Sequence, residues 1–325
     1  MVAEHFFSIK SEDDFNKAAL EVFNFQAKNC LIYAQYIKHL NINFHKIDHY
    51  EKIPFLPISF FKSNTVLSSD LPVQITFSSS GTTGQITSRH LVTKLSLYED
   101  SFNKAFELFY GPVKDICLLA LLPSYLEREG SSLIYMVDDL LKQSQHPESG
   151  YFLHNHIDLY NTLLALKQSG QKTILIGVTY ALLDFLEQYQ IDFPELIVME
   201  TGGMKGKRKE MVREELHHVL CQGFGVKDIH SEYGMTELLS QAYSKGKGIF
   251  FTPPWMKILL RDTSDPLSLI SSQQIGGINV IDLANVNSCA FIATQDLGKI
   301  HNDNGFEVIG RFDNADIRGC NLLVQ

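Results

Sequence analysis

The stretch "QITFSSSGTTGQITSRH", residues 74–90, is the most informative part of this chain. A short β-like run at 75–77 leads into three serines, Gly81, two threonines and Gly84. Glycine permits backbone conformations closed to other residues, so consecutive N–H groups can turn inward while the hydroxyls add donors. The stretch therefore predicts a loop that wraps an anion, with a triphosphate as the natural guest. A flexible turn is the alternative if the loop is taken alone, and the sequence is not a Walker A element.

Around this loop, short apolar runs alternate with amphipathic helical stretches. This alternation is typical of an α/β fold with a mainly parallel sheet covered by helices. The first forty residues read as helical, and the final eighty read as strands joined by turns, which predicts a smaller β subdomain. The predicted strands of the parallel part are residues 75–77, 116–122, 173–178, 196–199 and 226–230. Polar or glycine-rich segments follow several of these strands, at the edge where such sheets bind ligands.

Composition excludes several classes of function. A net charge of −9 without a Lys/Arg cluster argues against nucleic acid as a partner. No apolar run approaches the roughly 18 residues that span a bilayer, and the first residues lack a signal-peptide pattern. We therefore expect a cytoplasmic protein without a membrane span. The five cysteines are scattered and the histidines lack zinc spacing, so neither a disulfide framework nor a zinc site is predicted.

A second motif, at residues 233–237, offers the groups that a nucleotide needs. Tyr233 supplies a ring to stack on a base, and Gly234 allows close approach of the backbone. Thr236 supplies a hydroxyl for phosphate, and Glu237 a carboxylate able to hold Mg²⁺. We therefore expect this motif to lie at the same site as the loop.

Three further positions complete the pattern. Gly202 and Gly203 would let the backbone approach a flat ligand edge. Asp296 could accept hydrogen bonds from ribose hydroxyls, and Arg311 could meet ribose or phosphate. Taken singly, Asp296 or Arg311 is explained as well by a buried cap or a surface ion pair. The order of the motifs along the chain favours the ligand.

In that order, S-S-G-T-T-G, G-G, Y-G-M-T-E, a late Asp and G-R-x-D, the chain resembles the acyl-adenylate-forming superfamily. Within it, "IPFLPISFFKS" (53–63), "EYGMTE" and the ending "GRFDNADIRGCNLLV" are similar to the acyl-protein synthetase family, also called long-chain-fatty-acid–luciferin-component ligase. The resemblance implies an adenylating domain over residues 1–309, then a hinge remnant and short tail, 310–325, without the superfamily's C-terminal lid domain.

The resemblance also implies an activity: ATP and Mg²⁺ activate a carboxylic, in this family fatty, acid to acyl-AMP. The acyl group then passes to a cysteine near the C-terminus, here Cys320, and on to a partner. The implied protein partner is an acyl-donor or acyl-acceptor protein that is reductase- or transferase-like. The implied phosphate-binding residues are Ser79, Ser80, Gly81, Thr82, Thr83 and Gly84. Tyr233 and Gly203 would hold adenine, and Asp296 and Arg311 the ribose.

The sequence departs from the superfamily in two places. The loop continues with residues 85–88, "QITS", instead of the usual proline and lysine, and only twelve residues follow Asp313. Arg318 or a partner subunit, such as a second copy of the chain, would then have to replace the lid's lysine. Arg318 would also favour the thiolate of Cys320. The alternative for Cys320 is a buried cysteine in a terminal strand.

The acyl pocket is the least readable part of the site. Val178 and Thr179 follow a predicted strand and are candidates for its wall, although core packing explains them nearly as well. His230 precedes the second motif and is a candidate neighbour of the acyl carboxylate. Two other functions stay open: an acyl- or aryl-CoA ligase similar to phenylacetate–CoA ligase, and a noncatalytic nucleotide- or acyl-binding module.

Overall fold

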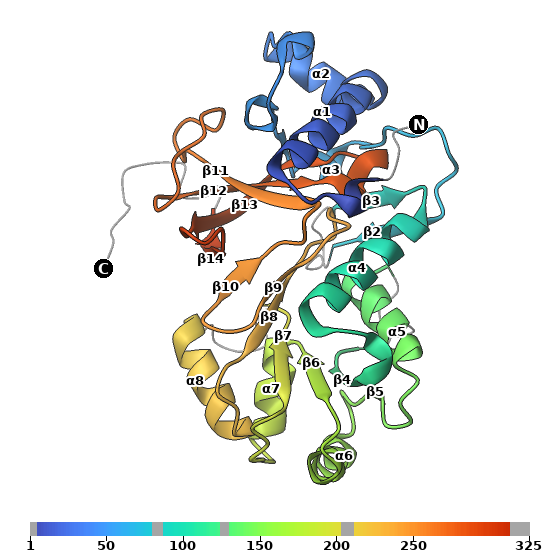
Figure 1. The fold of residues 1–325 in the computed structure, drawn as a ribbon, viewed down its shortest axis with the longest axis vertical. Helices are drawn as coiled ribbons and strands as arrows, with labels where there is room; N and C mark the ends of the chain where they lie inside the picture. Colours follow the sequence, from blue (N-terminus) through green and yellow to red (C-terminus); the bar gives the residue numbers. More distant parts are fainter. Residues whose placement is uncertain (1–4, 80–86, 124–129, 203–210, 313–325) are drawn as a thin grey trace.

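The computed structural model describes residues 5–79, 87–123, 130–202 and 211–312. Helices and strands alternate through the middle of the chain around one large sheet (Figure 1), which confirms the predicted α/β class. Within the described residues, no helix is long and apolar enough to cross a membrane.

Five parallel strands form one half of the large sheet, in the order β8-β7-β6-β4-β5. Every residue of β4 and β6 is buried, because helices cover both faces, and this is why these strands read as unbroken apolar runs. The strands are β4 (Cys117–Leu121), β5 (Gly150–Tyr151), β6 (Thr173–Gly177), β7 (Ile197–Glu200) and β8 (His230–Tyr233).

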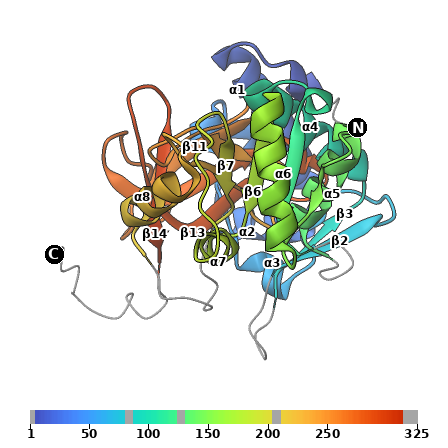
Figure 2. The same cartoon turned by 90° about the horizontal axis from the view of Figure 1, so that it is seen from below.

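Helices on the two sides of these strands pack through aromatic rings. Tyr98 and Tyr135 join α4 to α5, with ring centroids 6.0 Å apart, and Phe185 stacks on Phe224 at 5.8 Å to join α7 to α8. Figures 1 and 2 show α4 and α5 on one side and α7 and α8 on the other. The helices are α4 (Leu95–Tyr110), α5 (Ser132–Ser144), α6 (His156–Ser169), α7 (Thr179–Leu186) and α8 (Arg213–Phe224), with the short η4 (Val113–Asp115) before β4.

The later strands extend the same sheet in antiparallel fashion. β9 pairs with β8, and the order continues β10-β14-β13-β12-β11. The β region predicted for the final eighty residues is therefore hydrogen bonded to the parallel half through β9 and β10. The strands are β9 (Ala242–Ser244), β10 (Ile249–Phe251), β11 (Met256–Arg261), β12 (Ile275–Asp282), β13 (Phe291–Ile300) and β14 (Phe306–Arg311), with η5 (Leu283–Asn287) between β12 and β13.

The N-terminal segment packs on this antiparallel half. Ser11 caps α1 by accepting a hydrogen bond from Asp14 N, and the Gln26 side chain donates to the carbonyls of Asn285 and Val286 in η5. The segment contains η1 (His5–Ser8), α1 (Glu12–Asn29), α2 (Leu31–His39), η2 (Phe44–Lys46), η3 (Tyr50–Lys52), β1 (Leu56–Pro57), which pairs with β13, and α3 (Phe60–Ser63).

One predicted strand lies elsewhere than expected. Residues 75–77 were predicted to belong to the parallel sheet, but β2 (Ile75–Ser78) forms a separate two-stranded antiparallel hairpin with β3 (Arg89–Val92). The prediction was wrong because it overlooked β3: residues 88, 90 and 92 are buried while residue 89 is exposed, an alternation typical of a strand with one buried face, and this strand pairs with β2.

Candidate active site

Three predicted residues from distant parts of the chain meet at one carboxylate. The Tyr233 hydroxyl, at the end of β8, donates to Asp296 Oδ2 on β13 at 2.9 Å. Arg311 is the register neighbour of Asp296 on β14, and its Nε lies 3.2 Å from Oδ1. The side chain of Asp296 is 11% exposed and that of Arg311 is 70% exposed. The buried Tyr233 hydroxyl thus holds the Asp296 carboxylate in place, while the Arg311 guanidinium is exposed to solvent.

Burial governs the protonation of this group. It raises the pKa of Asp296, and the charges of Arg311 and Arg261 and the hydrogen bond from Tyr233 act in the opposite direction. Burial also raises the pKa of Tyr233 well above its usual value, and the nearby carboxylate raises it further. Tyr233 therefore stays a hydrogen-bond donor. Its ring packs against Phe250 and Phe306, with centroids 5.9 and 5.5 Å away.

A buried arginine that was not predicted from the sequence is linked to the backbone of Asp296 through Thr294. Arg261, on β11, donates to the Ile278 carbonyl and to Asn279 Oδ1, both at 2.8 Å, and also to the Thr294 carbonyl. Thr294 Oγ1 in turn accepts from the Asp296 backbone N–H at 3.1 Å.

The same guanidinium also reaches the end of the described chain. It lies over the Phe312 ring, 5.4 Å from its centroid. Arg261 therefore connects the backbone around Asp296 to the last residue before 313–325.

The second motif continues from β8 into a turn, where Gly234, Thr236 and Glu237 follow Tyr233. A Cβ at Gly234 would lie 2.4 Å from Oε1 of Glu232, so a larger residue here would require the Glu232 side chain to shift. The Glu237 side chain is buried, which raises its pKa, and a hydrogen bond with Ser88 opposes that shift. The predicted metal-binding carboxylate therefore lies against the base of the β2–β3 hairpin.

Two buried side chains near η5 hold the far side of this turn. Asn285 Nδ2 donates to the Glu237 carbonyl at 2.7 Å. Asp282 Oδ2 accepts from the backbone N–H groups of Leu239 and Ser240 at 2.8 and 2.9 Å. Burial raises the pKa of Asp282 to about 6, although these donors act to lower it.

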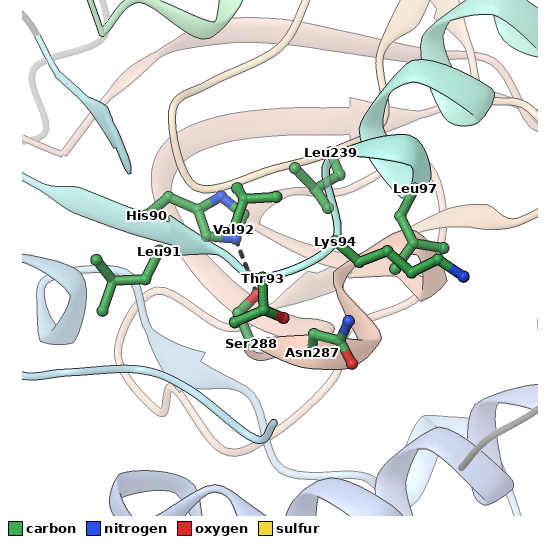
Figure 3. A pocket seen from close by; sticks show the side chains of 9 residues that line it. All are labelled: His90, Leu91, Val92, Thr93, Lys94, Leu97, Leu239, Asn287 and Ser288. Carbon is green, nitrogen blue, oxygen red and sulfur yellow. Dashed lines mark hydrogen bonds between the residues drawn. The ribbon is translucent and has the colours of Figure 1, made fainter. Parts of the chain in front are cut away.

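His90 holds the near side of the turn. Its Nδ1 lies 2.9 Å from the Thr236 carbonyl oxygen, and its Nε2 lies 2.9 Å from Ser288 Oγ (Figure 3). A cavity of about 10 Å³ beside these groups has room for one water molecule and is too small for a substrate. It is lined by His90, Leu91, Val92, Thr93, Lys94, Leu97, Leu239, Asn287 and Ser288.

The base of the predicted phosphate loop is described, but the loop itself is not. Ser79 N donates to the Ser88 carbonyl at 3.1 Å, and Ser79 Oγ accepts from Ser88 N at 2.9 Å. These bonds close the hairpin beside Glu237. Ser80, Gly81, Thr82, Thr83, Gly84, Gly203, Arg318 and Cys320 lie outside the described residues.

The predicted pocket residues Val178 and Thr179 are buried where β6 passes into α7, and a glutamate links Thr179 to Gly202. Thr179 Oγ1 and Gly202 N both donate to Glu200 Oε2, at 3.3 and 2.8 Å. Gly202 has a φ of +56°, a conformation that favours glycine. Burial acts to raise the pKa of Glu200, but the neighbouring His217 and Ser231 and the hydrogen bond from Gly202 N hold it below its usual value.

His230 is not brought to the Tyr233 cluster. It begins β8, and three residues of strand, about 10 Å, separate it from Tyr233. Its Nδ1 lies 3.3 Å from the Tyr110 hydroxyl, and burial lowers its pKa to about 4.

This sheet, with its parallel half, antiparallel extension and polar cluster at the end of β8, is the fold of acyl-adenylate-forming ligases. The structure of 2-hydroxyisobutyryl-CoA ligase in an open conformation with 2-HIB-AMP and CoA matches with a TM-score of 0.66 at 11% identity, covering 93% of this chain and 70% of that one. ATP-bound MatB from Rhodopseudomonas palustris matches with a TM-score of 0.55 at 16% identity, covering 74% of this chain and 48% of that one. The chain thus spans about half the length of MatB.

The particular family follows from the sequence. The chain belongs to the LuxE acyl-protein synthetase family, whose model matches residues 6–325. This confirms the resemblance and the class of enzyme, an acid–thiol ligase that forms acyl-adenylates. No curated protein sequence matches the chain.

Proposed function

We propose that the protein uses MgATP to activate a fatty acid as acyl-AMP and then transfers the acyl group to Cys320 and on to a partner protein. The observation that carries the nucleotide part is the joining of Tyr233, Asp296 and Arg311 at one carboxylate. These residues come from three separate motifs, in the order in which the family has them.

The residues present suit an adenosine. The two oxygens of Asp296 are acceptors for the two ribose hydroxyls, and the exposed guanidinium of Arg311 is a donor to ribose or phosphate oxygens. The Tyr233 ring is mostly buried between aromatic neighbours. We therefore assign to Tyr233 the role of orienting Asp296 through its hydroxyl. Ser79 and the hairpin would present the phosphates to Thr236.

Glu237 is the residue proposed to hold Mg²⁺. Its buried carboxyl favours the protonated form, and a cation beside it would favour the charged form. Mg²⁺ often binds one protein carboxylate together with substrate phosphates and would supply neutralisation of the phosphate charge. Glu237 alone could therefore be the protein's carboxylate ligand to Mg²⁺, with the other ligands supplied by the phosphates and water.

The chemistry has two steps. An oxygen of the substrate carboxylate attacks the α-phosphorus of ATP, and pyrophosphate leaves with the electrons of the broken P–O bond. The Cys320 thiolate then attacks the carbonyl of the mixed anhydride, AMP leaves, and a thioester forms. An acyl-accepting protein would then take the acyl group from Cys320 and complete the cycle.

The first step is tested by ATP–pyrophosphate exchange across a panel of fatty and aromatic acids. Exchange that requires both ATP and a carboxylic acid is the expected result. ATP binding without any acid-dependent exchange would instead favour the noncatalytic module.

The second step is tested with ATP, Mg²⁺ and radiolabelled fatty acid. Wild-type protein should retain label that neutral hydroxylamine releases, and Cys320→Ser should retain none while keeping exchange activity. Since the structure of 2-hydroxyisobutyryl-CoA ligase holds CoA together with 2-HIB-AMP, CoA is the essential comparison. Product formation that needs CoA and survives Cys320→Ser would favour the CoA ligase.

A further inference from the structure

The buried face of β3 points at the turn that carries Thr236 and Glu237. Residues two apart on a strand share a face, and Ser88 and His90 are 2% and 1% exposed, while Arg89 between them is exposed. Ser88 neighbours the Glu237 carboxyl and acts to lower its pKa, and His90 Nδ1 lies 2.9 Å from the Thr236 carbonyl oxygen. The strand that follows residues 80–86 therefore contacts the second motif at two consecutive residues.

The chemistry of its partners fixes the tautomer of His90. The Thr236 carbonyl oxygen can only accept, so Nδ1 carries the proton and donates across 2.9 Å. Nε2 then accepts from the Ser288 hydroxyl, also at 2.9 Å (Figure 3). The edge of the ring packs against Phe61, with centroids 5.7 Å apart. Burial lowers the pKa of His90 to about 4, which keeps the ring neutral at physiological pH.

The turn itself has no regular hydrogen-bonding partner strand between Tyr233 and Ala242. Asn285 and Asp282 anchor its later residues to η5 and the end of β12. His90 anchors its earlier part, and it does so from the hairpin rather than from η5. Both ring nitrogens of this buried, neutral imidazole are engaged, so the ring joins the hairpin to the turn at a fixed distance, and the loss of either bond would leave a buried polar group unpaired.

We propose that His90 is a positioning residue, which sets the distance between the β2–β3 hairpin and the Thr236–Glu237 turn so that their phosphate- and metal-binding groups act together. The proposal rests on the proposed function of these two segments in binding MgATP. His90 acts through the Thr236 backbone and touches no substrate.

Two near-isosteric variants separate the two bonds of the ring. In His90→Asn the side-chain amide nitrogen can occupy the place of Nδ1 and keep the donor to Thr236. In His90→Gln the longer side chain reaches only the place of Nε2 and keeps the contact with Ser288. Ser288→Ala removes that second contact and serves as a control for it.

The measurement is steady-state ATP–pyrophosphate exchange with a carboxylic acid that the wild type accepts, alongside the thermal midpoint of each variant. We expect His90→Asn and Ser288→Ala to stay near wild type. In His90→Gln, kcat should fall about 10- to 100-fold, because a small misplacement of groups at a reaction site lowers the rate by about this factor. The change in KM for the acid should be smaller. The thermal midpoints of the Asn and Gln variants should agree.

Equal kcat values for the Asn and Gln variants would overturn the proposal, as would a kcat loss that follows the thermal midpoint. The proposed function fails separately, if the wild type shows no exchange with any acid. In that event MgATP affinity, measured by calorimetry, decides: weaker binding in His90→Gln than in His90→Asn supports positioning, and equal binding rejects it.

Discussion

The Tyr233 hydroxyl donates a 2.9 Å hydrogen bond to Asp296, a residue 63 positions later in the chain. The bond joins the end of β8 to the middle of β13, on opposite halves of the sheet. Asp296 is thereby oriented before any ligand arrives. Because the carboxylate is already oriented, less side-chain entropy is lost when a nucleotide binds.

Tyr233→Phe should weaken MgATP binding about 10-fold, because a hydrogen bond to a charged group is worth roughly 1.5–3 kcal/mol and part of it survives through Arg311. Calorimetric titration with MgATP measures the effect. Tyr243→Phe is the matched control, since the Tyr243 hydroxyl is buried and has no hydrogen-bond partner among the residues that the structure describes. Equal affinities in the two variants would remove Tyr233 from the site.

Arg261→Met should lower the free energy of unfolding by about 2–4 kcal/mol, because several buried acceptors lose a charged donor. Those acceptors are the carbonyls of Ile278 and Thr294 and the side chain of Asn279. Urea unfolding gives the value.

Lys257→Met, on the same strand, is the control for Arg261→Met. Lys257 pairs with Glu12 nearer the surface, where ion pairs contribute roughly 0–1 kcal/mol. Comparable losses in the two variants would contradict the role given to Arg261.

Glu237→Gln should reduce acid-dependent exchange by about 10²–10³-fold, the usual effect of removing one electrostatic group from a reaction site. Because burial raises the pKa of Glu237, protons compete with Mg²⁺, so the wild type should need more Mg²⁺ as the pH is lowered. Exchange measured across Mg²⁺ concentrations at several pH values tests both points.

Glu232→Gln is the control for Glu237→Gln. Burial and the charge of Glu200 raise the pKa of Glu232 to about 8, so at neutral pH its carboxyl is mostly protonated and glutamine resembles it. This variant should leave the Mg²⁺ requirement near that of the wild type. The same Mg²⁺ dependence in wild type and Glu237→Gln would argue against Glu237 as the ligand.

Acid should destabilise the wild type more steeply than His90→Asn. The folded protein lowers the pKa of His90 to about 4 from an ordinary value of 6.5. Between these values the unfolded chain holds a proton that the folded chain lacks, so folding stability falls as the pH falls, by up to about 1.4 kcal/mol per pH unit. Above the ordinary value the group contributes no pH dependence.

Urea unfolding of both proteins over this pH window tests the effect. His230, whose pKa is also lowered to about 4, is present in both proteins and cancels in the comparison. Parallel curves for wild type and His90→Asn would show that His90 takes up its proton as readily in the folded state as in the unfolded one.

The regular part of the fold was predictable because burial leaves a periodic trace. The all-apolar runs of β4 and β6 and the stripes of α4 and α5 follow directly from the layers they occupy. β8 was predicted at 226–230 but lies at His230–Tyr233. Its residues are His-Ser-Glu-Tyr, and two of them have side-chain partners on other elements, His230 with Tyr110 and Tyr233 with Asp296. Periodicity of hydrophobic residues cannot reveal a strand of this kind.

The candidate site was predictable only where residue type and motif order coincide. Tyr233, Glu237, Asp296 and Arg311 were all singled out in this way, and their roles toward a nucleotide stay predictions. His90 and Arg261 were missed because their partners lie on other segments of the chain, Thr236 being 146 positions from His90 and Ile278 being 17 positions from Arg261. For His90, the only sign in the sequence was a polar residue on the buried face of β3.

The uninterrupted ladder from β5 to β11 has a mechanical consequence. Since β9 and β10 bond the parallel strands to the antiparallel ones, neither half can swing about the other without breaking backbone pairs. Tyr233 and Asp296 therefore keep their separation through a catalytic cycle. Amide exchange in both halves should report a common opening free energy, as in a single cooperative unit.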